Sequence, residues 1–197
     1  MSTTQLFVEL LVIGFGVVVW CAILIAGILE LPFDKAIFDI KLSLWPPLLG
    51  VAYVFGILLD RLMYSAFDRR KNEIEERILG DIASPKAPVI ERIVMEASEP
   101  LNYMIHYNRS RSRICRAWFL NFFLIGLSFI IWHYRVNQMP AWCAFFIISA
   151  LVSLSAVSYW VGGLLEEDHY NNIRWSYNYC IERKRHDGIS SSETETL

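Results

Sequence analysis

Four long apolar runs constrain this chain more than any other feature of its sequence. They cover residues 6–29, 45–59, 117–134 and 141–165, and the second continues to residue 67 through the charged pair Asp60–Arg61. A helix needs roughly 18–20 apolar residues to cross about 30 Å of hydrocarbon, and these runs are close to or above that length. None of them alternates polar and apolar residues as barrel strands do. The sequence therefore predicts an all-α integral membrane protein with four transmembrane helices.

The composition agrees with a membrane protein. Hydrophobic residues make up 55% of the 197 residues and charged residues 19%, whereas soluble proteins average about 45–50% and about 25%. No Lys or Arg precedes the first run, which is also too long for the apolar part of a signal peptide, so we interpret it as a retained span. The four cysteines show no paired spacing, and we expect free thiols at Cys21, Cys115, Cys143 and Cys180.

Basic residues indicate how the spans are oriented. The segment between the second and third runs holds eleven Lys and Arg residues, and the segment after the fourth run holds four. The two opposite loops hold three together. Because cytoplasmic loops carry the excess of Lys and Arg, this distribution predicts that both termini and the central segment are cytoplasmic.

The chain divides by composition into four parts. Residues 1–67 and 117–165 each hold two spans, and residues 68–116 and 166–197 are polar. Isoleucine and valine recur at helical spacing in the central polar part, and the stripe of the fourth span continues into the tail. We therefore expect a small helical cytoplasmic layer. From about residue 187 Ser, Thr and Glu dominate, and we expect that end to be disordered.

Four arginines form the densest basic cluster: Arg109, Arg111, Arg113 and Arg116. On a helix Arg109, Arg113 and Arg116 share one face. Such a row can bind phospholipid headgroups, a nucleotide or an acidic partner surface. The alternative is that the row only anchors the topology of the third span, and the sequence leaves both interpretations open.

Small residues recur at helical spacing in three of the spans. They are Ala22 and Ala26 in the first, Ala52 and Gly56 in the second, and Ser149, Ser153 and Ala156 in the fourth. Faces of this kind let helices approach closely, so we expect packing surfaces there. The contacts can form within one chain or between copies, and we expect a homo-oligomer.

The sequence offers few groups for catalysis or metal binding. Residues 166–169 read Glu-Glu-Asp-His, but consecutive positions point around a helix and do not converge on a metal. Within the spans, we expect Glu9 to reach the headgroup region and Asn121 to hydrogen-bond across helices. The sequence has no phosphate loop, no nucleotide fingerprint and no nucleophile beside a base. We expect no enzyme activity, no cofactor, no metal and no direct binding of nucleic acid.

A chain of this size with four spans, cytoplasmic ends and a basic helical cytoplasmic layer resembles the membrane subunit of the Kiwa anti-phage defence system. The resemblance covers the whole chain as an architecture. It implies a bacterial inner-membrane protein that forms a tetramer, holds a soluble DNA-binding partner at its cytoplasmic face and responds to phage at the envelope.

Two functions follow as hypotheses. The first is a non-enzymatic scaffold or sensor of the inner membrane that oligomerises and docks a cytoplasmic partner through residues 68–116 and the tail. The second is an oligomeric pore-forming effector that depolarises the membrane. In both, the lipid bilayer and further copies of the chain are partners.

Overall fold

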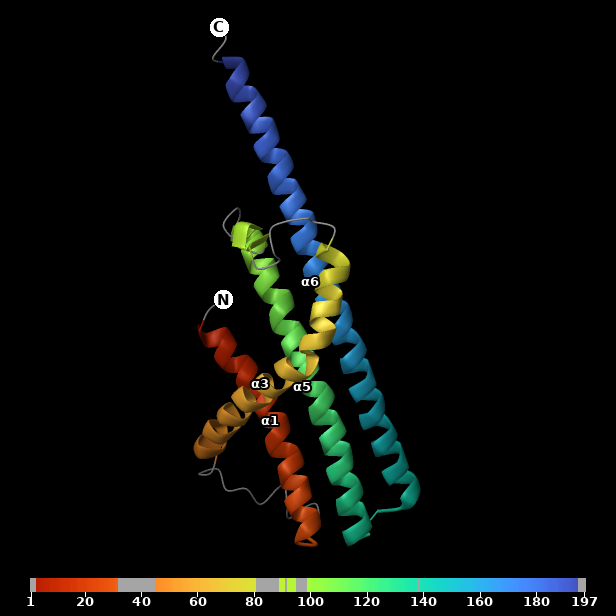
Figure 1. Ribbon diagram of the computed structural model, residues 1–197. Helices are drawn as coiled ribbons and strands as arrows, with labels where there is room; N and C mark the ends of the chain where they lie inside the picture. The colour runs from red at the N-terminus through yellow and green to blue at the C-terminus, as the bar shows by residue number, and fades with distance from the viewer. Residues whose placement is uncertain are drawn as a thin grey trace. The chain divides into compact units, whose positions relative to one another are not determined.

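Four long helices make up most of the chain in a computed structural model, which describes residues 3–31, 45–80, 89–90, 92–94, 99–137 and 139–194. The helices are α1 (Thr3–Ile28), α3 (Trp45–Leu79), α5 (Glu99–Val136) and α6 (Ala141–Thr194), labelled in Figure 1. Each is long and apolar enough to cross a membrane. The predicted all-α fold with four candidate spans is confirmed, and the chain is a multi-pass membrane protein.

Three of the helices are longer than a bilayer requires. α3, α5 and α6 have 35, 38 and 54 residues, and a helix rises about 1.5 Å per residue. α3 continues past the second apolar run and ends at Leu79, within the polar part of the chain. α6 runs to Thr194, although the sequence predicted disorder from about residue 187. No proline interrupts the sequence after Pro140, so nothing there removes a backbone donor from the helix.

The chain forms two compact units. One comprises residues 1–66 and 112–163 and contains the four apolar runs; we call it the membrane unit. The other comprises residues 67–111 and 164–197 and contains most of the charged residues; we call it the polar unit. α3, α5 and α6 each contribute residues to both.

In the membrane unit, α5 and α6 pack antiparallel along their apolar parts. The hydroxyl of Ser155 donates to the carbonyl of Phe119 at 2.9 Å. Nearer the short connection between the helices, Phe129 and Trp132 share a cluster with Ala144. α1 runs parallel to α5, because its early residue Ile13 bonds to Asn121 and its end at Leu31 bonds to Trp132. Odd-numbered spans of a multi-pass chain run in the same direction, and these two do so.

The C-terminal ends of α1 and α5 are each followed by a residue in the left-handed conformation. Glu30, two residues past the end of α1, has φ 55°, and the amide of Leu31 donates to the carbonyl of Ala26 at 2.9 Å. α5 ends with Asn137 at φ 45°, a residue that tolerates this conformation well. The indole N–H of Trp132 donates to the carbonyl of Leu31 at 3.0 Å and joins the ends of α1 and α5.

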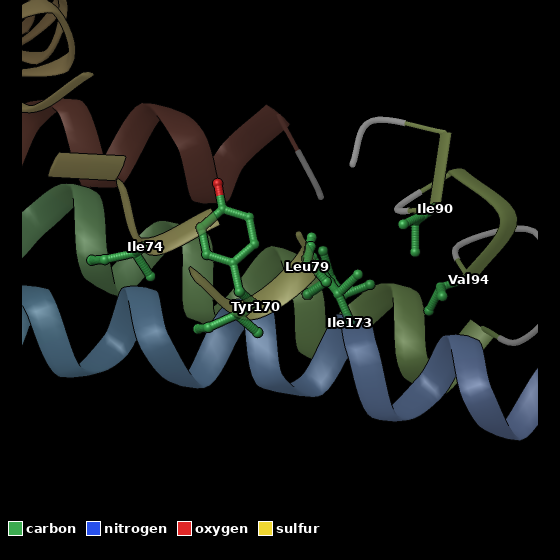
Figure 2. Close-up of a cluster of buried hydrophobic side chains, with 8 residues drawn as sticks. Ile74, Leu79, Ile90, Val94, Tyr170 and Ile173 are labelled. Atoms are coloured by element: carbon green, nitrogen blue, oxygen red, sulfur yellow. The ribbon is translucent and has the colours of Figure 1, made fainter. Parts of the chain in front are cut away.

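The polar unit has a hydrophobic core of its own, which Figure 2 shows. Its buried side chains come from α3, α5, α6 and the helical residues between α3 and α5: Ile74, Ile78, Leu79, Ile90, Val94, Ile105, Tyr170 and Ile173. The sequence predicted helical stripes on these segments, and the stripes meet in one cluster. The helical residues 89, 90 and 92–94 supply Ile90 and Val94, which are 1% and 0% exposed.

Candidate functional sites

A cluster of opposite charges lies inside the membrane unit. Arg113 on α5 reaches Glu9 on α1, with Nη1 3.7 Å from Oε2, and Asp60 on α3, with Nε 3.4 Å from Oδ1. Glu9 is 5% exposed, and the side chains of Arg113 and Asp60 are 22% and 25% exposed. The guanidinium therefore lies between two carboxylates from different helices, and it ties three helices together.

The positions of these residues in the sequence explain where the charge cluster forms. Glu9 is in the first turns of the first apolar run, Asp60 directly follows the second, and Arg113 lies four residues before the third. All three are thus near the same ends of their spans. Isolated charges are costly in hydrocarbon, and pairing at the edge of the apolar layer lowers that cost.

α1 also contacts its neighbours through backbone and amide groups. The side-chain amide of Asn121 is fully buried, and its N–H donates to the carbonyl of Ile13 at 2.9 Å. The expectation that Asn121 bonds across helices is confirmed. Its Oδ1 is buried without a hydrogen-bond partner in the described chain. A Cβ at Gly16 would lie 2.2 Å from Asn121 Nδ2, so only glycine leaves room for this amide.

The small residues of the second span lie where α3 approaches α1 closely. A Cβ added at Gly14 would be 1.6 Å from the carbonyl oxygen of Ala52, and one added at Gly56 would be 2.0 Å from that of Leu10. The backbones of α1 and α3 therefore touch at Ala52 and Gly56. In α1, Ala26 is 3% exposed in the cluster around Trp132, and Ala22 is half-buried.

The small residues of the fourth span lie on the outside of the membrane unit. Ser149, Ser153 and Ala156 are exposed in α6. The hydroxyl of Ser153 donates to the carbonyl of Ser149 at 2.8 Å, so it is satisfied within its own helix. These residues therefore make no buried contact within the described chain, whereas Ala52 and Gly56 face α1.

The predicted arginine row is distributed over the two units. Arg113 and Arg116 belong to the membrane unit, and Arg109 and Arg111 belong to the polar unit. Arg113 lies between carboxylates. Arg111 is exposed, and its Cζ lies 4.1 Å from the centre of the Tyr107 ring.

Polar contacts surround the core of the polar unit. Arg77 pairs with Glu167, and the hydroxyl of Tyr170 donates to Glu75 at 3.0 Å. The guanidinium of Arg174 donates to the carbonyl of Ile78 at 3.2 Å. These contacts join α3 to the part of α6 that follows the fourth apolar run, so this part of α6 packs as a structural element of the unit.

His169, the last residue of the Glu-Glu-Asp-His stretch, has a shifted pKa. It follows the end of the apolar run at residue 165 and lies outside the membrane span. Burial and, to a smaller extent, the positive charges of Arg109, Lys71 and His106 together lower its pKa to about 4. Its Nδ1 is buried and has no hydrogen-bond partner among the described residues. His169 is therefore neutral at pH 7.

Aromatic side chains are exposed on the polar unit. Trp175 and Tyr179 of α6 are 66% and 52% exposed, and their rings stack with centres 5.9 Å apart. Tyr103 of α5 is 68% exposed and stacks on Tyr107 with ring centres 6.2 Å apart.

Sequence reasoning missed both the charge cluster and the Trp175–Tyr179 pair. The pair carried a usable signal, because a Trp and a Tyr four residues apart lie off the buried Ile173–Tyr177 stripe. The charge cluster carried none, since its members are 51 and 53 residues apart.

The chain matches no protein-family model, no curated protein and no solved structure. Among the described residues, no group of three or more His, Cys, Asp and Glu side chains could hold a metal ion. Cys21, Cys115 and Cys143 are free thiols, and the side chain of Cys180 lies outside the described residues.

Proposed function

We propose that this protein is a non-enzymatic scaffold or sensor of the bacterial inner membrane that oligomerises and docks a soluble cytoplasmic protein on its polar unit. The exposed Trp175–Tyr179 pair is the observation that carries the proposal. Trp175 follows the fourth apolar run by ten residues, or about 15 Å along a helix. The headgroup layer adds only about 5–8 Å to each side of the hydrocarbon. Lipid would not cover this pair, and exposed apolar surface in water is typical of protein interfaces.

Charge and architecture support the same proposal. The distribution of fifteen basic residues against three favours a cytoplasmic polar unit with both termini inside. The resemblance to the membrane subunit of the Kiwa system favours a tetramer and a DNA-binding soluble partner, so that nucleic acid is bound through that partner. The polar unit folds around its own core, which gives a partner a fixed surface.

Affinity capture from detergent extract tests the docking role. Trp175→Ala combined with Tyr179→Ala should strongly reduce recovery of the soluble partner. Trp142→Ala is the matched control, because Trp142 has the same 66% exposure but lies in the apolar run that faces lipid. Deletion of residues 68–116 and the tail should abolish recovery. Undiminished recovery with the double variant would contradict docking at this pair.

The alternative function is a pore-forming effector. The exposed Ser149 and Ser153 on α6 favour it, because hydroxyls on an outer face could line a channel between copies. Expression of the chain alone with a potential-sensitive dye separates the two functions. Rapid depolarisation without any partner would support the pore, and an unchanged potential would support the scaffold.

A further inference from the structure

Three residues of α5 form a stacked ladder on the surface of the polar unit. Tyr103, Tyr107 and Arg111 are spaced four residues apart and lie on one face of the helix. The Tyr103 and Tyr107 rings lie 22° from parallel, and the Arg111 guanidinium covers the Tyr107 ring at 4.1 Å. A guanidinium on an aromatic ring is held by cation–π attraction, and its N–H edges stay free to donate.

Arg111 differs in this respect from the other arginines of its region. Its contact with the described residues is the Tyr107 ring, and no carboxylate among them pairs with it. Arg113, two residues later, has Glu9 and Asp60 on two sides. The guanidinium of Arg113 is therefore paired with carboxylates. The guanidinium of Arg111 is exposed and oriented by the Tyr107 ring, with N–H groups that can donate to a ligand.

The depth of Arg111 along α5 matches the headgroup layer. The charge cluster at Arg113 marks the edge of the apolar layer, because charges are costly deeper in hydrocarbon. Arg111 precedes Arg113 by about 3 Å of helix, and Tyr107 precedes it by about 9 Å. Since the guanidinium covers the Tyr107 ring, it lies between these levels. This interval overlaps the roughly 5–8 Å occupied by lipid headgroups.

We propose that Arg111, stacked on Tyr107, binds the phosphate of an anionic phospholipid headgroup. The planar fork of arginine donates to two phosphate oxygens at once, and such charge-assisted pairs are about twice as strong as neutral hydrogen bonds. The stack with Tyr107 fixes the fork before the lipid arrives, so less side-chain entropy is lost on binding. This site is independent of the partner-docking surface at Trp175 and Tyr179.

Lipid titration followed by native mass spectrometry tests the site. The full chain in detergent is titrated with phosphatidylglycerol and, separately, with phosphatidylcholine. Arg111→Gln should weaken phosphatidylglycerol binding about tenfold, and Arg111→Lys about threefold because a point charge replaces the fork. Tyr107→Leu should weaken it although no charge changes. Binding of phosphatidylcholine should be weaker and the same in all variants.

Arg61→Gln is the matched control. Arg61 is also exposed and lies next to Asp60 at the same edge of the apolar runs, but no aromatic ring stacks on it in the described chain. Phosphatidylglycerol binding should stay within about twofold of wild type in this variant. Equal losses in Arg61→Gln and Arg111→Gln would overturn the proposal, because they would show only a general charge effect. Unchanged binding in Arg111→Gln would overturn it as well.

Two further measurements keep the result interpretable. Arg111 is exposed, so the melting temperature of its variants should equal that of wild type. Inorganic phosphate is added as a competitor to distinguish a lipid from a soluble anion. Retention of phosphatidylglycerol in excess phosphate would support a lipid site, and displacement by low phosphate would assign the site to soluble phosphate and overturn the lipid proposal.

Discussion

Arg111 and Arg113 are two residues apart on α5, but the polar unit contains the first and the membrane unit the second. Arg113 lies between two carboxylates inside a bundle of apolar helices. Arg111 is exposed and lies on the ring of Tyr107, which is half-buried. The two environments differ in the same way, because Glu9 is buried at the contact between helices, whereas Arg111 is exposed on the polar unit. Two arginines close in sequence thus differ in role: Arg113 holds helices together through its carboxylate partners, and Arg111 is the residue that we propose binds a ligand.

The largest effect should come from neutralising Arg113. Arg113→Gln leaves Glu9 and Asp60 without their shared cation, and removing one partner of a buried pair typically costs about 3–5 kcal/mol. We expect the free energy of unfolding to fall by about 4 kcal/mol, measured by unfolding in mixed micelles with rising SDS fraction. Arg69→Gln is the control, because Arg69 is 93% exposed in its pair with Glu73 and should change stability little. Similar small losses in both variants would contradict the buried role.

The next effect tests the contact between α1 and α3. Gly14→Ala places a methyl group on the carbonyl of Ala52, and backbone atoms cannot move aside without separating the helices. Overpacking of this kind costs about 1–3 kcal/mol, and we expect the upper end. Gly50→Ala is the matched control in α3, because nothing lies within 4 Å of its added Cβ. It should be neutral or slightly stabilising. Equal stability of the two variants would show that the helices do not touch at Gly14.

How far the sequence predicted this architecture depends on how local each signal is. The four spans were predictable because each is indicated by one continuous apolar segment, without reference to any other part of the chain. Glu9 is 5% exposed and paired with Arg113, whereas its position in the sequence indicated only that it lies near the headgroup region. That pairing joins positions 104 residues apart, and no spacing rule connects them. The common face of Arg109, Arg113 and Arg116 followed from helical periodicity, whereas the partner of each arginine depends on tertiary packing.

A third prediction concerns acidification of the polar unit. The pKa of His169 is about 4 in the folded chain and about 6.5 in the unfolded chain. Between these values the unfolded chain binds a proton that the folded chain does not. Stability is therefore complete above about pH 6.5 and falls as the pH is lowered toward about 4. The groups that face His169 are Arg109 and His106 of α5 and Lys71 of α3, all of which disfavour a further positive charge.

Thermal unfolding at about pH 7.5 and about pH 5 measures this effect. The melting temperature of wild type should fall by a few degrees at the lower pH. His169→Gln removes the titrating group, so the melting temperature of this variant should fall less than that of wild type. Carboxylates contribute equally to both chains, and the difference between the two falls isolates the histidine. Identical falls would show that His169 is accessible to protons in the folded chain.

The smallest effect distinguishes the charge of Arg113 from its shape. Arg113→Lys keeps one positive charge at the same place, so it should insert with unchanged topology and retain most of the pairing. An ammonium group has three N–H donors but lacks the wide planar arrangement of the guanidinium, so it should match the positions of Glu9 and Asp60 less well. We expect a loss of about 1 kcal/mol, roughly the value of one hydrogen bond.

Arg109→Lys and Arg116→Lys extend the test to the other two arginines that share a helix face with Arg113. Labelling of introduced cysteines from outside checks topology in each variant, because an inverted chain would imitate a packing defect. If the row only anchors topology, all three lysine variants should match wild type in stability, since lysine satisfies the positive-inside rule equally well. A loss confined to Arg113→Lys would show that planar pairing at the charge cluster, and not charge on the row, stabilises the membrane unit. That result would leave the neighbouring Arg111 as the arginine whose geometry serves binding.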